Sequence, residues 1–226
     1  MKYAICFFPT VGILCGGALF LWGRISLFLG LSGILFAAVA VSLPLFITGG
    51  IHMDGYMDTV DALASHQSRE RKLEILKDPH CGAFAVLYCG VYLLLYFALF
   101  WEIYAAGLVD VCCPIFTFSR SLCALCVLTM PNARGSGMLF SFTRDTEKAK
   151  IAAVMAVVAL LAGIAMLRLS FFPGGMGILL GFVAMIYYRF MAKKQFGGVT
   201  GDTSGFFLQI CELMTTAGIW MGGKLL

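Results

Sequence analysis

Apolar runs long enough to cross a lipid bilayer recur along the whole of this 226-residue chain. Hydrophobic residues make up 61% of it and charged residues only 12%, whereas soluble domains carry about 25% charged residues. Backbone groups in a bilayer must be satisfied within the protein, which favours helices. These features predict an all-α fold, a polytopic integral membrane helical bundle that forms a single membrane-embedded domain over residues 1–226.

The spacing of the apolar runs predicts about seven transmembrane helices, with a range of about six to eight, since a span needs about 20 residues. The first run is predicted to be a span rather than a removable signal peptide, because no small-residue cleavage site follows it. The predicted spans are Ala4–Trp22, Leu27–Ile47, Ala83–Ala106, Leu108–Met130, Ile151–Leu169, Gly175–Met191 and Phe206–Met221. A tight turn containing Arg24 is expected between the first two.

Three aspartates, Asp54, Asp58 and Asp61, lie in the stretch GGIHMDGYMDTVD. On a helix their spacing places all three on one face, and no basic residue between them neutralises the repulsion. Hard carboxylate oxygens favour Mg²⁺, with Mn²⁺ as an alternative. The stretch therefore predicts a metal site. The alternative is a solvated acidic helix face that joins two membrane spans.

The residues around these acids suggest further roles. Gly49, Gly50 and Gly55 leave the backbone open to phosphate oxygens. His52 precedes the first acid by two residues and would point away from the acids on a helix. It could still act as a general base if the Gly-Gly entry before it is non-helical.

A second candidate stretch, GGVTGDTSG at residues 197–205, directly precedes the last predicted span. Backbone N–H groups in a glycine-rich loop beside a helix N-terminus bind anions. The stretch is not a Walker A motif, because no Lys-Ser/Thr pair follows its glycines. Asp202 would add a fourth acidic ligand. The predicted phosphate-binding residues are Gly197, Gly198, Thr200, Gly201 and Thr203; the alternative is a plain flexible turn.

Three more charged residues are candidates for the site. Arg120 and Glu212 fall inside predicted spans, where charges are costly and usually functional. They either form a structural pair or line a cavity that handles substrate charge, and we favour the cavity. Arg134, in the polar loop Pro131–Lys150, either clamps a phosphate or marks only the orientation of the chain.

Most of the 16 Lys and Arg residues lie near the N-terminus and in three polar segments, residues 48–82, 131–150 and 192–205. The positive-inside rule places these segments in the cytoplasm, so we expect the active site on the cytoplasmic face of the cell membrane. Within the first of them, Ser68–Asp78 predicts an amphipathic surface helix with Leu73 and Leu76 on one face and Lys72 on the polar face. A solvated connector is the alternative.

Together these stretches resemble the cobalamin synthase family, the adenosylcobinamide-GDP ribazoletransferases, over nearly the whole chain. Family members usually begin further upstream, and Ala62 stands where the family commonly has glycine. The likeness is carried by GGIHMDGYMDTVDAL, by SRERKLEILKD with Gly82 after it, by FSRS around Arg120, by NARGSGM, by FGGVTGDTSG followed by Glu212, and by FFPTVGILCGG near the start.

The resemblance implies a Mg²⁺-dependent transfer at the membrane. A hydroxyl of α-ribazole, or of its 5′-phosphate, attacks the cobinamide-proximal phosphorus of adenosylcobinamide-GDP, releasing GMP and giving adenosylcobalamin or its 5′-phosphate. Asp54, Asp58 and Asp61 would hold the metal, Asp202 would position the diphosphate or a second ion, and a carboxylate or His52 would take the proton. The implied partners are these substrates and the lipid bilayer. We expect no nucleic-acid partner and leave a homo-oligomer open.

Two other functions compete with this one. A lipid synthase similar to the CDP-alcohol phosphotransferases also uses aspartates on membrane helices, but its further Gly and Asp positions after an Ala-Arg pair are missing here. A transporter would use Arg120 and Glu212 to line a path, but the other charged motifs lie in loops and the two halves of the chain show no repeat.

Overall fold

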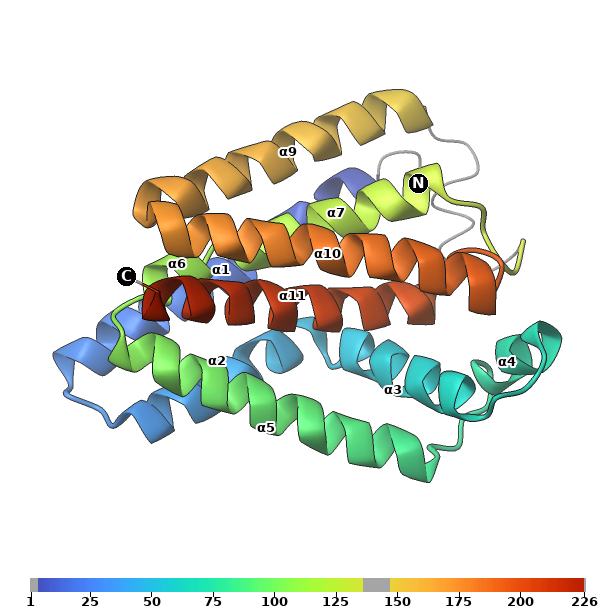
Figure 1. The fold of residues 1–226 in the computed structure, drawn as a ribbon, viewed down its shortest axis with the longest axis horizontal. Helices are drawn as coiled ribbons and strands as arrows, with labels where there is room; N and C mark the ends of the chain where they lie inside the picture. Colours follow the sequence, from blue (N-terminus) through green and yellow to red (C-terminus); the bar gives the residue numbers. More distant parts are fainter. Residues whose placement is uncertain (1–3, 136–146, 226) are drawn as a thin grey trace.

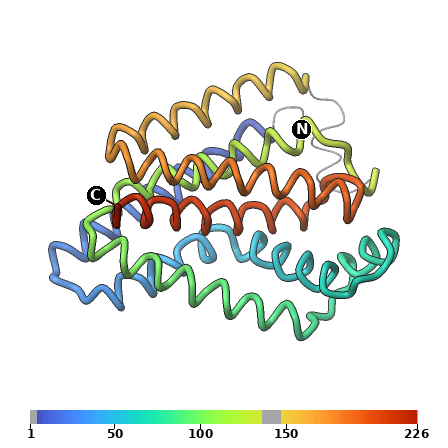
Figure 2. The backbone as a smooth tube through the Cα atoms, viewed as in Figure 1, coloured from blue at the N-terminus to red at the C-terminus, as the bar shows by residue number. Residues whose placement is uncertain are grey.

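The computed structural model describes residues 4–135 and 147–225, and helices make up nearly all of this part of the chain. The long helices lie side by side along the longest axis of the molecule (Figure 1, Figure 2). The predicted all-α membrane bundle is confirmed. In order, the elements are η1 (Ala4–Phe7), α1 (Phe8–Phe28), α2 (Gly33–Thr48), α3 (Ile51–Ala64), α4 (Arg69–Ile75), α5 (Ala83–Ala105), α6 (Val109–Cys112), α7 (Ile115–Thr129), α9 (Lys148–Leu169), α10 (Phe171–Gln195) and α11 (Gly201–Lys224).

Within the described residues, 5 segments are long and apolar enough to cross a membrane, or up to 6 if α2 and α3 together form one bent span. The five are Ile5–Phe28, Ala83–Ala105, Val109–Thr129, Lys148–Leu169 and Phe171–Gln195, which correspond to five of the predicted spans. The seventh predicted span is helical within α11, but α11 does not meet the same criterion. Other helices surround α11 and bury much of it, so it can carry polar residues (Figure 1).

The turn predicted at Arg24 is wrong. Helix α1 continues through this residue to Phe28, and the chain turns instead at Gly30, whose φ of 62° lies in the left-handed region. Glycine adopts that conformation without steric cost. Arg24 is a good helix former, and its Nη2 donates a 2.5 Å hydrogen bond to Asp110 Oδ2. The first two predicted spans are therefore divided about six residues later than expected.

Two consecutive glycines separate α2 from α3. Gly49 and Gly50 have φ values of 63° and 75°, and the two helices differ in direction by 95°. No atom lies within 4 Å of where a Cβ would be at either position, so it is the backbone conformation that favours glycine. This bend turns the acidic helix α3 so that it packs between α11 and α5 rather than forming a separate loop.

The predicted surface helix Ser68–Asp78 is present as α4. Ser68 caps it by accepting a hydrogen bond from the N–H of Arg71. Leu76 is buried, as its predicted apolar position requires, but the prediction that Lys72 lies on the polar face is wrong. Lys72 is buried because its Nζ donates a 2.5 Å hydrogen bond to Gln195 Oε1 at the end of α10. Helix α4 therefore packs against the bundle.

Two polar segments that are distant in sequence pair at one end of the bundle. The N–H of Ala133 donates to the Val199 carbonyl at 3.0 Å, and the N–H of Val199 donates to the Pro131 carbonyl at 2.9 Å. Helix α4 lies at the same end (Figure 1). The described parts of the predicted polar segments therefore share one end. Residues 136–146 of the Pro131–Lys150 loop lie outside the described residues.

Candidate active site

Helices α3 and α11 touch backbone to backbone. A Cβ added to Gly55 would lie 2.8 Å from the carbonyl oxygen of Asp202, and one added to Gly205 would lie 2.8 Å from that of His52. Glycine at both positions lets the helices approach this closely. The structure thus gives Gly55 a packing role, while its predicted phosphate contact remains a prediction. The close approach brings the acidic stretch beside the glycine-rich stretch.

Replacing Gly55 with alanine should lower transfer activity by at least about tenfold, because a displacement of even 1 Å at a site is costly. The added methyl group must push α3 away from the backbone of Asp202. Gly90→Ala is the matched control, since Gly90 lies within α5, does not line the cavity, and a Cβ there meets nothing within 4 Å. Turnover and thermal unfolding of both variants test this expectation. Equal activities for the two variants would contradict it.

The predicted acidic cluster is present around Asp58. The negative charges of Asp54, Asp202 and Asp61 act on its carboxyl group, and Arg134 is the cation that acts on it. Asp54 is exposed and Asp58 is half-buried. In the described part of the chain, no three His, Cys, Asp or Glu side chains are grouped closely enough to hold a metal ion together. The donor set is nevertheless all carboxylate, which fits Mg²⁺.

Asp61 caps the start of α5. Its Oδ2 accepts a 2.6 Å hydrogen bond from the N–H of Gly82, and its Oδ1 accepts a 2.8 Å bond from the N–H of Ala85. Gly82 has no side chain with which to cap the helix, and a Cβ there would lie 2.6 Å from Asp61. A carboxylate at this helix end also interacts favourably with the helix dipole. Metal binding by Asp61, predicted from spacing, would compete with these two bonds.

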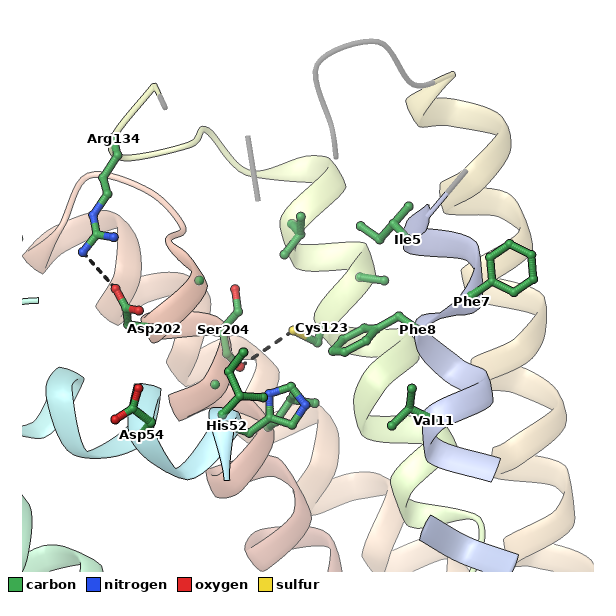
Figure 3. A pocket seen from close by; sticks show the side chains of 16 residues that line it. Ile5, Phe7, Phe8, Val11, His52, Asp54, Cys123, Arg134, Asp202 and Ser204 are labelled. Carbon is green, nitrogen blue, oxygen red and sulfur yellow. Dashed lines mark hydrogen bonds and ion pairs between the residues drawn. The ribbon is translucent and has the colours of Figure 1, made fainter. Parts of the chain in front are cut away.

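Arg134 joins the two polar segments over Asp202 (Figure 3). Its Nη2 donates to Asp202 Oδ2 at 2.9 Å and to the Leu76 carbonyl at 3.2 Å. Asn132 fixes this loop, because its Oδ1 accepts hydrogen bonds from the N–H groups of Arg134 and Gly135. The Nε of Arg134 is buried and has no partner among the described residues. This unpaired N–H donor and the positive charge of the guanidinium favour binding of an anion.

Thr200 and Thr203 form a capping box at the start of α11. The N–H of Thr203 donates to Thr200 Oγ1 at 3.1 Å, and the N–H of Thr200 donates to Thr203 Oγ1 at 2.9 Å. Both side chains are buried by this arrangement. They satisfy helix-end donors, and their predicted contact with phosphate remains a prediction. Gly201 follows Thr200 and lines the cavity described below.

The two glycines before this helix pack against neighbouring segments. Gly197 has a φ of 78°, and a Cβ there would collide with the guanidinium group of Arg69 on α4. A Cβ on Gly198 would lie 2.1 Å from the Pro131 carbonyl oxygen, within the pairing of the two polar segments. Glycine is therefore favoured at both positions because neighbouring segments lie too close to leave room for a side chain. Phosphate binding by them is a separate prediction.

A cavity of about 560 Å³ lies between η1, α1, α3, α7 and α11. Asp54, Asp202 and Arg134 line one side of it, and apolar side chains including Phe8 line the other (Figure 3). The cavity contains residues from both stretches that the sequence singled out. Sequence analysis missed its apolar side, because nothing in the FFPTVGILCGG segment distinguishes a cavity wall from an ordinary span.

His52 lies in this cavity on the side away from the acids. Its ring packs edge-on against Phe8, with 5.9 Å between ring centroids (Figure 3). Gly49 and Gly50 before it are non-helical, which was the condition for its role as a base, but His52 itself belongs to the helical residues of α3, and that role stays a prediction. As the helical spacing predicted, it points away from Asp54. We assign it to the wall of the cavity.

Arg120 and Glu212 form a buried ion pair in the middle of the bundle. Arg120 Nη1 lies 2.7 Å from Glu212 Oε1, and the side chains are 1% and 2% exposed. Ser119 Oγ also donates to Glu212, and Arg120 donates to the Phe116 carbonyl. Neither charged residue lines the cavity. The structure therefore shows the structural pair rather than the cavity-lining arrangement that we favoured, although the buried Nε of Arg120 has no partner among the described residues.

These features define a helical, multi-pass membrane protein with an acid- and arginine-containing cavity at the polar end of its bundle. The chain belongs to the family described as cobalamin-5-phosphate synthase, which matches residues 1–220. This confirms the resemblance seen in the sequence.

Similar proteins named adenosylcobinamide-GDP ribazoletransferase occur in several bacteria. The one from Lachnoclostridium phytofermentans is 44% identical over 214 residues, covering 95% of this chain and 82% of the relative. That from Acinetobacter baumannii is 35% identical over 215 residues, covering 92% and 82%. That from Desulfitobacterium hafniense is 33% identical over 225 residues, covering 94% and 84%. No solved structure matches the chain.

Proposed function

We propose that this chain transfers α-ribazole, or its 5′-phosphate, to adenosylcobinamide-GDP with release of GMP. The observation that carries the proposal is the cavity in which Asp54, Asp202 and Arg134 converge. The family membership and the names of the relatives support it. They do not favour a lipid synthase or a transporter.

The chemistry is a displacement at phosphorus. A ribose hydroxyl of the nucleoside attacks the cobinamide-proximal phosphorus, an O–P bond forms, and the O–P bond to the GMP group breaks. The hydroxyl proton passes to a carboxylate, for which the exposed Asp54 is the candidate on the cavity wall. Arg134 contributes positive charge to the diphosphate, because its guanidinium is held over Asp202 and retains an unpaired donor.

We propose that a divalent cation binds among the same carboxylates. No three of them are grouped closely enough in the described residues to hold it alone, so phosphate oxygens of the substrate would complete its coordination. Asp58 and Asp202 would hold Mg²⁺ while Asp54 accepts the proton, with Asp61 as a further ligand only if it gives up its bonds to α5. Bound Mg²⁺ supplies neutralisation of the diphosphate and of the leaving oxygen. The repulsion among these carboxylates supports the proposal, since a cation relieves it.

We place the reaction at the cytoplasmic face of the cell membrane. The described polar segments lie at one end of the bundle (Figure 1), and most Lys and Arg residues belong to those segments or to the chain start. The positive-inside rule supports this orientation.

Turnover by the purified chain in liposomes tests the proposal. Adenosylcobinamide-GDP and α-ribazole are supplied with and without Mg²⁺, and GMP and the corrinoid product are followed together. We expect equal amounts of both products, formed only when Mg²⁺ is present. A folded chain that releases no GMP overturns the proposal; a lipid product would point to the lipid synthase, and flux without a new bond to the transporter.

A further inference from the structure

The cavity has two chemically different sides. Asp54, Asp202 and Arg134 lie on one side, and Phe8 and Val11 of α1 lie on the other with His52 against Phe8, while Ser204 lies between the two sides (Figure 3). Ala124, Val127 and Leu208, from α7 and α11, complete the apolar lining. A ligand that fills this cavity must therefore carry polar groups at one end and an apolar group at the other.

The volume of the cavity limits which substrate enters it fully. At about 560 Å³ it lies within the range of about 300–1,000 Å³ that holds a drug-sized molecule. A nucleoside has this size, whereas the corrin ring system with its side chains is several times larger. The corrin is too large to be enclosed by this cavity, so we place it at the cavity's opening, with its diphosphate reaching the acidic side. The nucleoside is the substrate that fits inside.

The reaction determines the orientation of the nucleoside in the cavity. Its ribose hydroxyl must reach the phosphorus, which the acids and Arg134 bind under the proposed function. The base, at the other end of the molecule, then meets the apolar side. Guanine is a poor occupant there, because its several polar edge groups would lose hydrogen bonds to water. The base of α-ribazole, a flat dimethylbenzimidazole, has one free ring nitrogen and two methyl groups and loses far less.

We propose that the apolar side of the cavity, formed by Phe8, His52, Ala124, Val127 and Leu208, binds the base of the incoming nucleoside and selects apolar bases. The site rests on the proposed function for the identity of the nucleoside. The edge-on pair of Phe8 and His52 presents aromatic surface to a planar ring, an arrangement that aromatic groups favour.

The test separates binding of the two substrates. In Phe8→Ala we expect the KM for α-ribazole to rise about tenfold, as loss of an apolar contact of about 1.4 kcal/mol predicts, with the KM for adenosylcobinamide-GDP changed less than about twofold. The variant should also lose preference for the dimethylbenzimidazole nucleoside over its adenine counterpart. Phe28→Ala is the control, because Phe28 lies on the same helix and is 89% exposed; both KM values should stay unchanged.

Phe8→Leu covers the case in which the alanine variant does not fold, since leucine keeps the bulk and removes only the aromatic edge. A rise in the KM for adenosylcobinamide-GDP alone, or no change in either KM, overturns the base site while leaving the proposed function intact. Calorimetric binding of α-ribazole alone, compared between the unmodified chain and the Phe8 variants, separates the two proposals. Absence of turnover together with Phe8-dependent binding overturns only the function.

Discussion

Asp58→Asn reduces transfer by about 1,000-fold or more and leaves the chain folded. Asp58 is the acid on which the charges of Asp54, Asp61 and Asp202 act, so its loss removes the central carboxylate of the cation site. Metal stabilisation of a developing charge supplies several kcal/mol, and a loss of about 4 kcal/mol corresponds to about 1,000-fold in rate. Stability should be unchanged or slightly higher, because a repulsive charge disappears. Turnover and thermal unfolding measure the two effects.

Asp61→Asn distinguishes an acid that caps a helix from an acid that binds the cation. An asparagine keeps one acceptor oxygen, and its amide nitrogen cannot accept the second backbone N–H at the start of α5. This variant should unfold more easily, by about 1 kcal/mol, and should respond to Mg²⁺ concentration as the unmodified chain does. If Asp58→Asn transferred normally, or if Asp61→Asn alone lost its Mg²⁺ response, the division of roles between these two acids would be wrong.

Glu212→Leu destabilises the fold by about 3–5 kcal/mol, the usual cost of leaving one charge of a buried pair without its partner. The unpaired group is the guanidinium of Arg120, which is 1% exposed and surrounded by α1, α7 and α11. The double variant Arg120→Met with Glu212→Leu should recover most of this loss, because two apolar side chains of similar size replace both charges. Thermal unfolding in detergent micelles measures the whole cycle.

The same cycle separates a structural pair from one that handles substrate. A structural pair predicts that stability falls in the single variants and returns in the double variant, and that turnover follows stability. The opposite result would be stable but inactive single variants and a stable but inactive double variant. It would show that Arg120 and Glu212 act on the substrate.

Much of the fold could be predicted from sequence because its signals are local. The apolar runs gave α5 to within one residue and the ends of α9 within three, since each follows from composition alone. The acids on α3 and Asp202 on α11 were also identified, because spacing on a helix and a helix N-terminus are local features. That Asp202 would join these acids was predicted from the common cytoplasmic placement of the two stretches, and Asp54 and Asp202 do line one cavity.

What could not be predicted depends on contacts between distant segments. Asp61 looked like a metal ligand because its spacing matches Asp54 and Asp58, but its partners are backbone amides of Gly82 and Ala85, which no local pattern reveals. Gly55 was interpreted as a phosphate contact, whereas a glycine also serves where another helix passes closely. The turn predicted at Arg24 failed for a different reason, since the local signal that sets it is Gly30, six residues later.

The pairing of Ala133 with Val199 has a consequence for how the protein is made. The site draws on α3, on the segment after α7 and on the start of α11, so it cannot exist while only the early helices have left the ribosome. Helix α11 is too polar to be counted among the spans, and the helices that precede it supply the surfaces that bury it. Catalytic competence therefore arises late in biosynthesis, after insertion of the earlier helices. An incompletely translated chain would lie in the membrane as an inert bundle.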